Sequence, residues 1–240
     1  MDLTGKLVLV TGAAVRVGRA LAKAAAEAGA TVIIHYGTSE MEAHGFRSDI
    51  ESSGGEAHVI QANLQNVDEC QRLIERCSKI GPLYGLVNSA AIFEDRNLGN
   101  TDLDSWQRHM DINLRAPFLL SKAFWQSVGE REGRIVNILD WRALRPGGDH
   151  LPYTVSKAAL ATLTHSLAIA MAPNVTVNGM ALGAILPPVD GGETTTILKN
   201  VPAGRWAELD EVGETLIFLL TGPAYMTGEI ITLDGGRHLV

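Results

Sequence analysis

The sequence LVLVTGAAVRVG, residues 7–18, passes from an apolar run into a loop that contains two glycines. Residues 7–10 read as a buried strand, and residues 19–28 read as a helix that Gly29 ends. A loop between a strand and a helix brings backbone N–H groups and the positive end of the helix dipole to one place, which suits a pyrophosphate. The stretch therefore predicts a nucleotide-binding α/β fold.

Outward from this loop, apolar runs alternate with helix-forming segments along the whole chain. We expect further strands at residues 31–35, 57–60, 83–87, 134–139, 175–178 and 230–233, and further helices at 41–53, 67–79, 106–125, 153–171 and 208–220. The alternation implies a doubly wound parallel sheet of about seven strands with helices on both faces. No linker or repeat divides the chain, so residues 1–240 are expected to form a single Rossmann-type domain. Residues 183–205 have the composition of a mobile substrate loop.

Composition excludes several classes of protein. The 240 residues are 46% hydrophobic, carry a formal charge of -7 and contain no run of Lys or Arg, which opposes binding to a nucleic-acid backbone. Cys70 and Cys77 fit neither a disulfide framework nor a metal site and are expected to be ordinary buried thiols. No secretory leader and no apolar run of the ~20 residues that span a bilayer is found. We expect a cytoplasmic protein that binds no metal, membrane or nucleic acid.

The residues around the second expected strand bear on which nucleotide binds. The residue that ends this strand normally meets the adenosine ribose, and no acid stands there. His35 ends the strand, Tyr36, Thr38 and Ser39 offer hydroxyls after it, and Arg16 offers a cation. A 2′-phosphate is tolerated in such surroundings, which favours NADP(H) over NAD(H). The alternatives are a solvated loop arginine and a structural strand-end histidine.

Tyr153 and Lys157 are four residues apart in a segment expected to be helical, so both project from one face. A nearby cation lowers the pKa of a phenol from ~10 by roughly one to three units, which makes a useful general acid. Asp140 marks the carboxyl end of the fifth expected strand, where open α/β sheets bind ligands. We expect the three side chains to share one proton path. The alternatives are a surface Tyr-Lys pair, and a carboxylate paired with Arg142 or Arg145.

Other candidate residues follow the remaining strands. Asn63 stands after the third, where an adenine amino group could be met, and the small residues 88–90 after the fourth would let a flat ring approach the backbone. Phe93 is either a stacking platform for a planar substrate or plain packing. Asn113 either makes a helix-end hydrogen bond or holds water near Lys157.

Taken together, these motifs resemble the short-chain dehydrogenase/reductase family over essentially the full chain. They are the T-G-x-x-x-x-x-G loop, the Asn-x-Ala turn at residue 88, Asn113, Tyr153-x-x-x-Lys157 and the closing Leu-Asp-Gly-Gly at residues 233–236. The resemblance implies a nicotinamide-dependent oxidoreductase in which Tyr153 donates the proton, Lys157 binds ribose and activates the tyrosine, and Asn113 holds water. It also implies a homotetramer, with the Tyr153 helix and the C-terminal strand in its interfaces.

Two departures from that family pattern narrow the function. Arg16 stands where the family has its middle glycine, and Asp140 stands where it has a serine. An ionised aspartate cannot donate to the oxyanion that a ketone develops. A substrate with C=N bonds needs a proton on nitrogen instead, and a carboxyl bonded to Tyr153 could relay it. Together with Phe93, the departures resemble the pteridine reductase branch, in which the arginine contacts both the cofactor phosphate and the pterin and the phenylalanine side shields the ring.

We therefore expect an NADPH-dependent reductase of a dihydropterin- or dihydrofolate-type substrate. A reductase of another carbonyl or imine is the first alternative, and a catalytically idle NADP-binding sensor or scaffold is the second. The expected catalytic residues are Asp140, Tyr153, Lys157 and Asn113. The expected cofactor-binding residues are Thr11, Gly12, Arg16, Val17, Gly18, His35, Tyr36, Thr38, Ser39, Asn63, Leu64, Asn88, Ser89, Ala90, Tyr153, Lys157, Gly183 and Ile185. The expected substrate-binding residues are Arg16, Phe93, Asp140, Tyr153 and Leu186.

Overall fold

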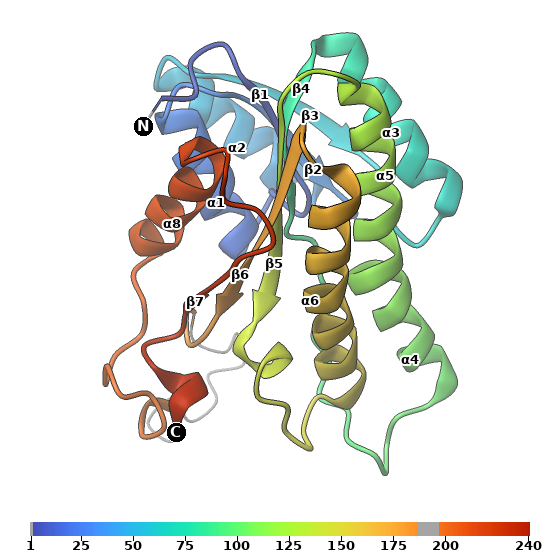
Figure 1. Ribbon diagram of the computed structural model, residues 1–240, viewed down its shortest axis with the longest axis vertical. Coiled ribbons are helices and arrows are strands. Elements are labelled where there is room, and N and C mark those ends of the chain that lie inside the picture. The colour runs from blue at the N-terminus through green and yellow to red at the C-terminus, as the bar shows by residue number, and fades with distance from the viewer. Residues whose placement is uncertain (1, 187–196) are drawn as a thin grey trace.

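The computed structural model describes residues 2–186 and 197–240, which form a seven-stranded parallel sheet with helices on both faces (Figure 1). The strands are β1 (Leu7–Val10), β2 (Thr31–Tyr36), β3 (Glu56–Gln61), β4 (Leu83–Asn88), β5 (Gly133–Asp140), β6 (Val175–Leu182) and β7 (Ile230–Leu233). Their order is β3-β2-β1-β4-β5-β6-β7, and every neighbouring pair is parallel. The order reverses between β1 and β4, which confirms the predicted doubly wound fold.

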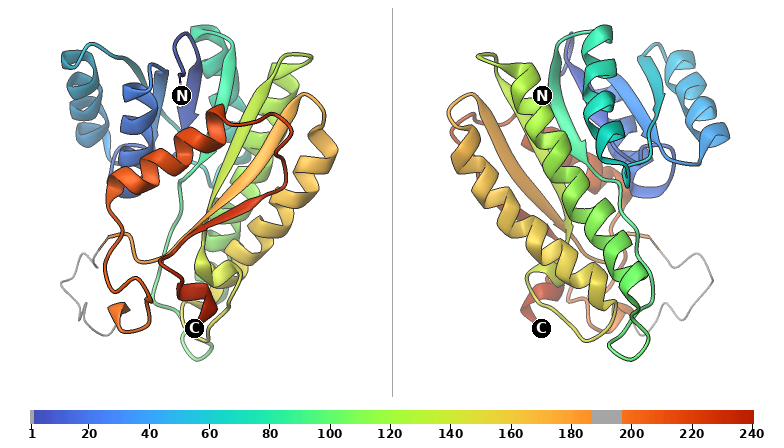
Figure 2. Two further views of the ribbon diagram at one scale, coloured as in Figure 1. Left: turned by 60° about the vertical axis from the view of Figure 1, so that its left-hand side comes forward. Right: turned by 90° about the vertical axis from the view of Figure 1, so that its right-hand side faces the viewer.

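The helices lie in two layers (Figures 1 and 2). They are α1 (Arg16–Glu27), α2 (Glu40–Ser52), α3 (Val67–Ile80), α4 (Leu103–Met110), α5 (Ala116–Val128), α6 (Leu151–Met171) and α8 (Leu209–Thr221). Successive side chains of a strand point to opposite faces. Val8 of β1 therefore joins Leu21 and Leu216 in the core under α1, α2 and α8, while Leu9 joins Phe124 in the core under α3, α5 and α6.

Helix α3 shows how local sequence produces one of these layers. The Asn66 side chain caps it by accepting hydrogen bonds from the backbone N–H groups of Asp68 and Glu69. Its buried residues, Cys70, Leu73, Ile74 and Cys77, have the spacing of one helix face. Both cysteines are free and buried, as predicted, and burial raises the pKa of Cys70 to about 11 and of Cys77 to about 12.

Residues 106–125 are helical throughout, as predicted, but a π-helical turn that was not predicted divides the region into two α-helices. Helix α4 ends at Met110, a π-helical turn spans Asp111–Arg115, and α5 begins at Ala116. Pro117 has no N–H to donate to the carbonyl four residues earlier, while the Ala116 N–H donates to the Asp111 carbonyl five residues earlier. Strand β2 ends one residue later than predicted, β5 includes Asp140, and β6 continues to Leu182.

Among residues 2–186 and 197–240, no helix has both the length and the hydropathy needed to cross a membrane. Within the same ranges, no group of three or more His, Cys, Asp or Glu side chains is placed to hold a metal ion.

Candidate active site

The loops after β1 and β4 meet where the strand order reverses. The Thr11 hydroxyl accepts hydrogen bonds from the N–H groups of Ser89 and Ala90 at 2.9 and 3.0 Å. A Cβ on Gly12 would lie 2.9 Å from the Ala90 Cα, and a Cβ on Gly18 would lie 2.1 Å from the Gly12 carbonyl oxygen. Neither contact is sterically possible, so both positions require glycine. The glycine loop is thereby held close to the segment after β4, as a dinucleotide cradle requires.

The structure gives His35 a structural position behind this loop. Its side chain is 2% exposed; Nδ1 accepts a hydrogen bond from the Gly12 N–H at 3.1 Å, and Nε2 lies 3.1 Å from the Ala62 carbonyl. Because Nδ1 must accept, Nε2 carries the proton and donates to Ala62. Burial lowers the pKa of His35 to about 4, so the imidazole is neutral at pH 7. His35 therefore supports the glycine loop through these hydrogen bonds, which agrees with the alternative that it is a structural strand-end histidine.

Arg16 adopts a backbone conformation that L-residues rarely take. Its φ is +52° at the start of α1, where the family has a glycine, and its side chain is exposed. This conformation costs about 1–2 kcal/mol for a residue with a side chain and tends to be kept at functional positions. Arg16 lies at the edge of an open groove of about 800 Å³ between α1 and α8. The guanidinium is therefore accessible to a ligand.

The residues after β2 and β3 occupy the far end of the same sheet edge. Tyr36 ends β2 and is buried, and its pKa is raised by burial and then by the neighbouring Glu40 carboxylate. Glu40 thus places an acid near the end of β2, where none was predicted. Thr38 is exposed, and Ser39 makes no side-chain capping bond at the start of α2. Asn63 is exposed; its side-chain oxygen accepts from the Gln65 N–H. Of the other two expected cofactor residues here, Leu64 is buried in the core under α3 and Val17 packs on the core under α1.

Asp140, Tyr153 and Lys157 come together at the carboxyl end of β5. The Tyr153 hydroxyl donates to Asp140 Oδ2 at 3.2 Å, and the Lys157 ammonium donates to the Ile138 carbonyl at 2.7 Å. The Lys157 Nζ lies 5.8 Å from the centroid of the Tyr153 ring. The predicted cluster of carboxylate, phenol and amine is therefore present in one place.

The prediction that Lys157 lowers the pKa of Tyr153 is wrong in this structure. The pKa of Tyr153 is raised well above 10, first by burial and then by the Asp140 carboxylate at its hydroxyl. The Lys157 ammonium instead points at the Ile138 carbonyl, and burial lowers its pKa to about 8, partly offset by Asp140. Tyr153 is consequently protonated at neutral pH and placed to donate.

Phe93 lies beside the Tyr153 ring, with centroids 4.6 Å apart and an interplanar angle of 82°. One face of Phe93 is stacked on the His150 imidazole at 4.0 Å and 20°. The ring is nevertheless 55% exposed. Its segment is anchored because His150 Nδ1 lies 2.9 Å from the Glu94 carbonyl and Arg108 binds the Glu94 carboxylate at 3.0 Å. An exposed aromatic surface is thus held next to the Tyr153 ring.

The side chains of Asn113 and Asn88 make hydrogen bonds to other residues of the protein. Asn113 is fully buried; its amide donates to the Ile92 carbonyl and the Ser156 hydroxyl and accepts from the Ile92 N–H. It therefore ties the Phe93 segment to α6, and its role in holding water stays a prediction. Asn88 donates to Asn137 at 2.8 Å and to Ser121 at 3.3 Å.

The segment after β6 begins the predicted substrate loop. A Cβ on Gly183 would lie 2.5 Å from the Asp234 Cα, so close packing against β7 requires glycine there. Ile185 is 6% exposed, and Leu186 packs against the core under α8. Residues 187–196 of the predicted loop lie outside the described residues.

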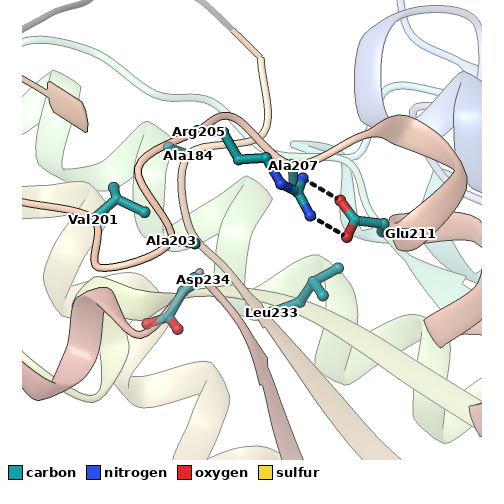
Figure 3. Close-up of a pocket in the computed structure, with 9 residues that line it drawn as sticks. Ala184, Val201, Ala203, Arg205, Ala207, Glu211, Leu233 and Asp234 are labelled. Carbon is teal, nitrogen blue, oxygen red and sulfur yellow. Dashed lines mark hydrogen bonds and ion pairs between the residues drawn. The ribbon is translucent and has the colours of Figure 1, made fainter.

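A cavity of about 120 Å³ lies between the segments that follow β6 and β7, and Val201, Ala203 and Arg205 of the predicted substrate loop line it (Figure 3). In it, Arg205 makes a two-point ion pair with Glu211 at 2.7 and 2.8 Å. Ligand sites are typically ~300–1,000 Å³, so this cavity is too small for a nicotinamide or a pterin.

Two residues beside the cluster, Asp149 and Arg237, were not predicted from the sequence. Arg142 was named as an alternative partner of Asp140, and the structure shows that pairing. The Arg237 guanidinium lies 4.3 Å from the ring centroid of Trp141, the residue after Asp140. The spacing of residues in the sequence does not predict this contact. The C-terminal turn lies near the end of β5 only because β5, β6 and β7 are neighbours in the sheet.

Comparison with known proteins identifies the family. A family model described as enoyl-(acyl carrier protein) reductase matches residues 12–238. The 3-oxoacyl-[acyl-carrier-protein] reductase of Synechocystis sp. is 35% identical over 98% of this chain and 97% of its own length. The chain belongs to the short-chain dehydrogenase/reductase family.

Solved structures agree with this assignment. FolM alternative dihydrofolate reductase 1 from Brucella canis, complexed with NADP, has a TM-score of 0.91 and 35% identity, covering 100% of this chain and 97% of that one. A short chain dehydrogenase from Burkholderia cenocepacia, in complex with NADP, has a TM-score of 0.93 and 32% identity over 99% of both chains. This short-chain dehydrogenase/reductase is accordingly an oxidoreductase that uses a nicotinamide cofactor.

Proposed function

We propose that the protein is an NADPH-dependent reductase of a pterin substrate of the dihydropterin or dihydrofolate type. The observation that carries the proposal is Asp140, which stands at the serine position of ordinary carbonyl reductases and accepts the Tyr153 hydrogen bond. A carboxylate there opposes a developing oxyanion but suits delivery of a proton to a ring nitrogen. The name of the FolM relative, an alternative dihydrofolate reductase, supports the same substrate class.

The residues present fit a phosphate-bearing dinucleotide. The glycine loop packs too closely for a Cβ at Gly12 or Gly18, and no side chain caps the start of α1, so its first backbone N–H groups can bind a phosphate. Arg16 at the start of α1 has a strained backbone and an exposed guanidinium, and Thr38 and Ser39 offer hydroxyls in the segment that follows β2. The cation favours the 2′-phosphate of NADP(H), and two solved relatives are complexed with NADP.

A nicotinamide cofactor held by the glycine loop, Arg16 and Lys157 would supply the hydride that a ring carbon of the substrate receives. Tyr153 gives its hydroxyl proton to the adjacent ring nitrogen, so that one C=N bond becomes CH–NH. Asp140, whose side chain is 15% exposed, carries a solvent proton back to the phenolate. Lys157, with a pKa of about 8, is mostly cationic at pH 7 and stabilises that phenolate while binding the ribose. Phe93 covers the ring of the substrate.

A second candidate is reduction of a 3-oxoacyl thioester, which the names of the curated relatives favour. That reaction develops negative charge on a ketone oxygen beside Tyr153. A carboxylate group at residue 140 offers no donor to this oxygen in place of the serine hydroxyl, which is why we place the pterin first.

The decisive experiment follows NADPH oxidation at neutral pH with dihydrobiopterin, dihydromonapterin, dihydrofolate and a 3-oxoacyl thioester. We expect turnover of at least one pterin, and a loss of that turnover in Asp140→Ser. If the wild-type protein reduces the thioester and no pterin, the pterin proposal is wrong. If Asp140→Ser retains pterin turnover, Asp140 is a structural carboxylate.

We also propose a homotetramer. Large apolar side chains are exposed on α5, at Phe118 and Trp125, and on α6, at Val155 and Ile169, and β7 lies at the edge of the sheet. Such surfaces favour burial against further copies of the chain. Light scattering coupled to size exclusion should give four times the mass of one chain, and a monomer would contradict the proposal.

A further inference from the structure

The two carboxylate oxygens of Asp140 have different partners. Oδ1 accepts a hydrogen bond from the Arg142 backbone N–H at 2.9 Å and lies 3.7 Å from the Arg142 guanidinium. Oδ2 receives the Tyr153 hydroxyl at 3.2 Å. Asp140 can therefore pair with Arg142 through Oδ1 and accept the Tyr153 hydrogen bond through Oδ2 at the same time.

Arg142 itself is held on several sides. Its guanidinium binds the Asp149 carboxylate at 2.8 Å and lies 5.0 Å from the centroid of Trp141 and 5.9 Å from that of Phe93. Only 13% of its side chain is exposed. Asp149 lies two residues before α6, which carries Tyr153. One cation thus contacts the end of β5, the chain that leads into α6 and the segment that carries the aromatic platform.

We infer that Arg142 is a positioning residue that fixes the rotation of the Asp140 carboxylate, so that Oδ2 faces the Tyr153 hydroxyl. The inference rests on the proposed role of that pair in proton delivery. The terminal torsion of an aspartate is broad, and one backbone N–H leaves it free to swing about that bond. The guanidinium fixes the same oxygen from a second direction and is itself fixed by Asp149. A lysine keeps the charge but not the planar fork that can contact two carboxylates at once.

The test compares Arg142→Met, Arg142→Lys and a control, Arg145→Met, which removes an exposed arginine from the same loop. We expect Arg142→Met to lower kcat on the order of 10- to 100-fold with little change in the KM for NADPH, because a small misplacement of a proton donor has that effect. Arg142→Lys should recover part of the loss, and added guanidinium ion should restore activity to Arg142→Met. The control should match the wild-type protein. A wild-type kcat in Arg142→Met, or a loss expressed only in KM, overturns the inference.

A crystal structure of Arg142→Met provides a readout that needs no substrate. We expect Asp140 Oδ2 to leave hydrogen-bonding distance of the Tyr153 hydroxyl, and an unchanged 3.2 Å contact refutes the positioning role. If Arg142→Met fails to fold, Asp149→Asn releases the guanidinium instead and receives the same two measurements. Absence of pterin turnover in the wild-type protein counts against the proposed function alone. The kinetic comparison then uses the 3-oxoacyl thioester, and the crystallographic comparison stands as it is.

Discussion

Protonation of His35 should destabilise the fold at mildly acidic pH. In the folded protein the imidazole accepts from the Gly12 N–H and is buried, and its pKa is about 4 instead of the ordinary 6.5. The unfolded chain binds this proton more readily than the folded protein does. The contribution of neutral His35 to the free energy of unfolding is therefore complete above pH 6.5 and is lost as the pH falls toward 4. The difference of about 2.5 units corresponds to about 3 kcal/mol in total, of which about 2.5 kcal/mol is lost by pH 4.5.

Urea unfolding of the wild-type protein and of His35→Asn measures this loss. An asparagine oxygen can still accept the hydrogen bond from the Gly12 N–H, but the side chain does not titrate. The variant therefore measures the loss of stability at low pH that comes from all other groups. Both proteins are unfolded at pH 7.5 and pH 4.5, at one protein concentration, because an oligomer's apparent stability depends on it. We expect the wild-type protein to lose about 2.5 kcal/mol more than the variant between the two pH values. Equal losses would mean that His35 has an ordinary pKa in the folded protein, and the role of the neutral imidazole in holding the glycine loop would be wrong.

Three further predictions concern the cofactor loop and the proton donor. Gly18→Ala places a Cβ 2.1 Å from the Gly12 carbonyl oxygen and must displace the loop, so calorimetry should show NADPH binding weakened at least about tenfold; near-wild-type affinity would contradict the cradle. Arg16→Gly relieves a φ of +52° and should raise stability by up to about 1 kcal/mol while reducing the preference for NADPH over NADH, and an unchanged preference would show that Arg16 does not meet the 2′-phosphate. Tyr153→Phe removes the hydroxyl that faces Asp140 and should lower kcat on the order of 10²- to 10⁴-fold with the Kd for NADPH preserved; retained turnover would move the donor role elsewhere.

The fold was predictable because its signals are local. Each strand is a short apolar run, each helix has its own apolar face, and the alternation of the two leaves a parallel sheet as the simple solution. The π-helical turn at Asp111–Arg115 was not predicted, because its apolar pattern is that of an α-helix. Only Pro117 in the sequence indicates an irregularity there.

The groups that occupy the candidate site could be named from the sequence alone. The glycines at 12 and 18, the spacing of Tyr153 and Lys157 on one helix face, and Asp140 at a strand end are properties of short segments, and backbone geometry places them. How these groups act on one another depends on the folded arrangement of β5 and α6. The pKa of Tyr153 is raised because its ring is buried in the folded protein and because Asp140 from β5 accepts the hydrogen bond of its hydroxyl. Electrostatic and hydrogen-bond effects depend on distance and burial, and these are set when strands far apart in the chain pair in the sheet.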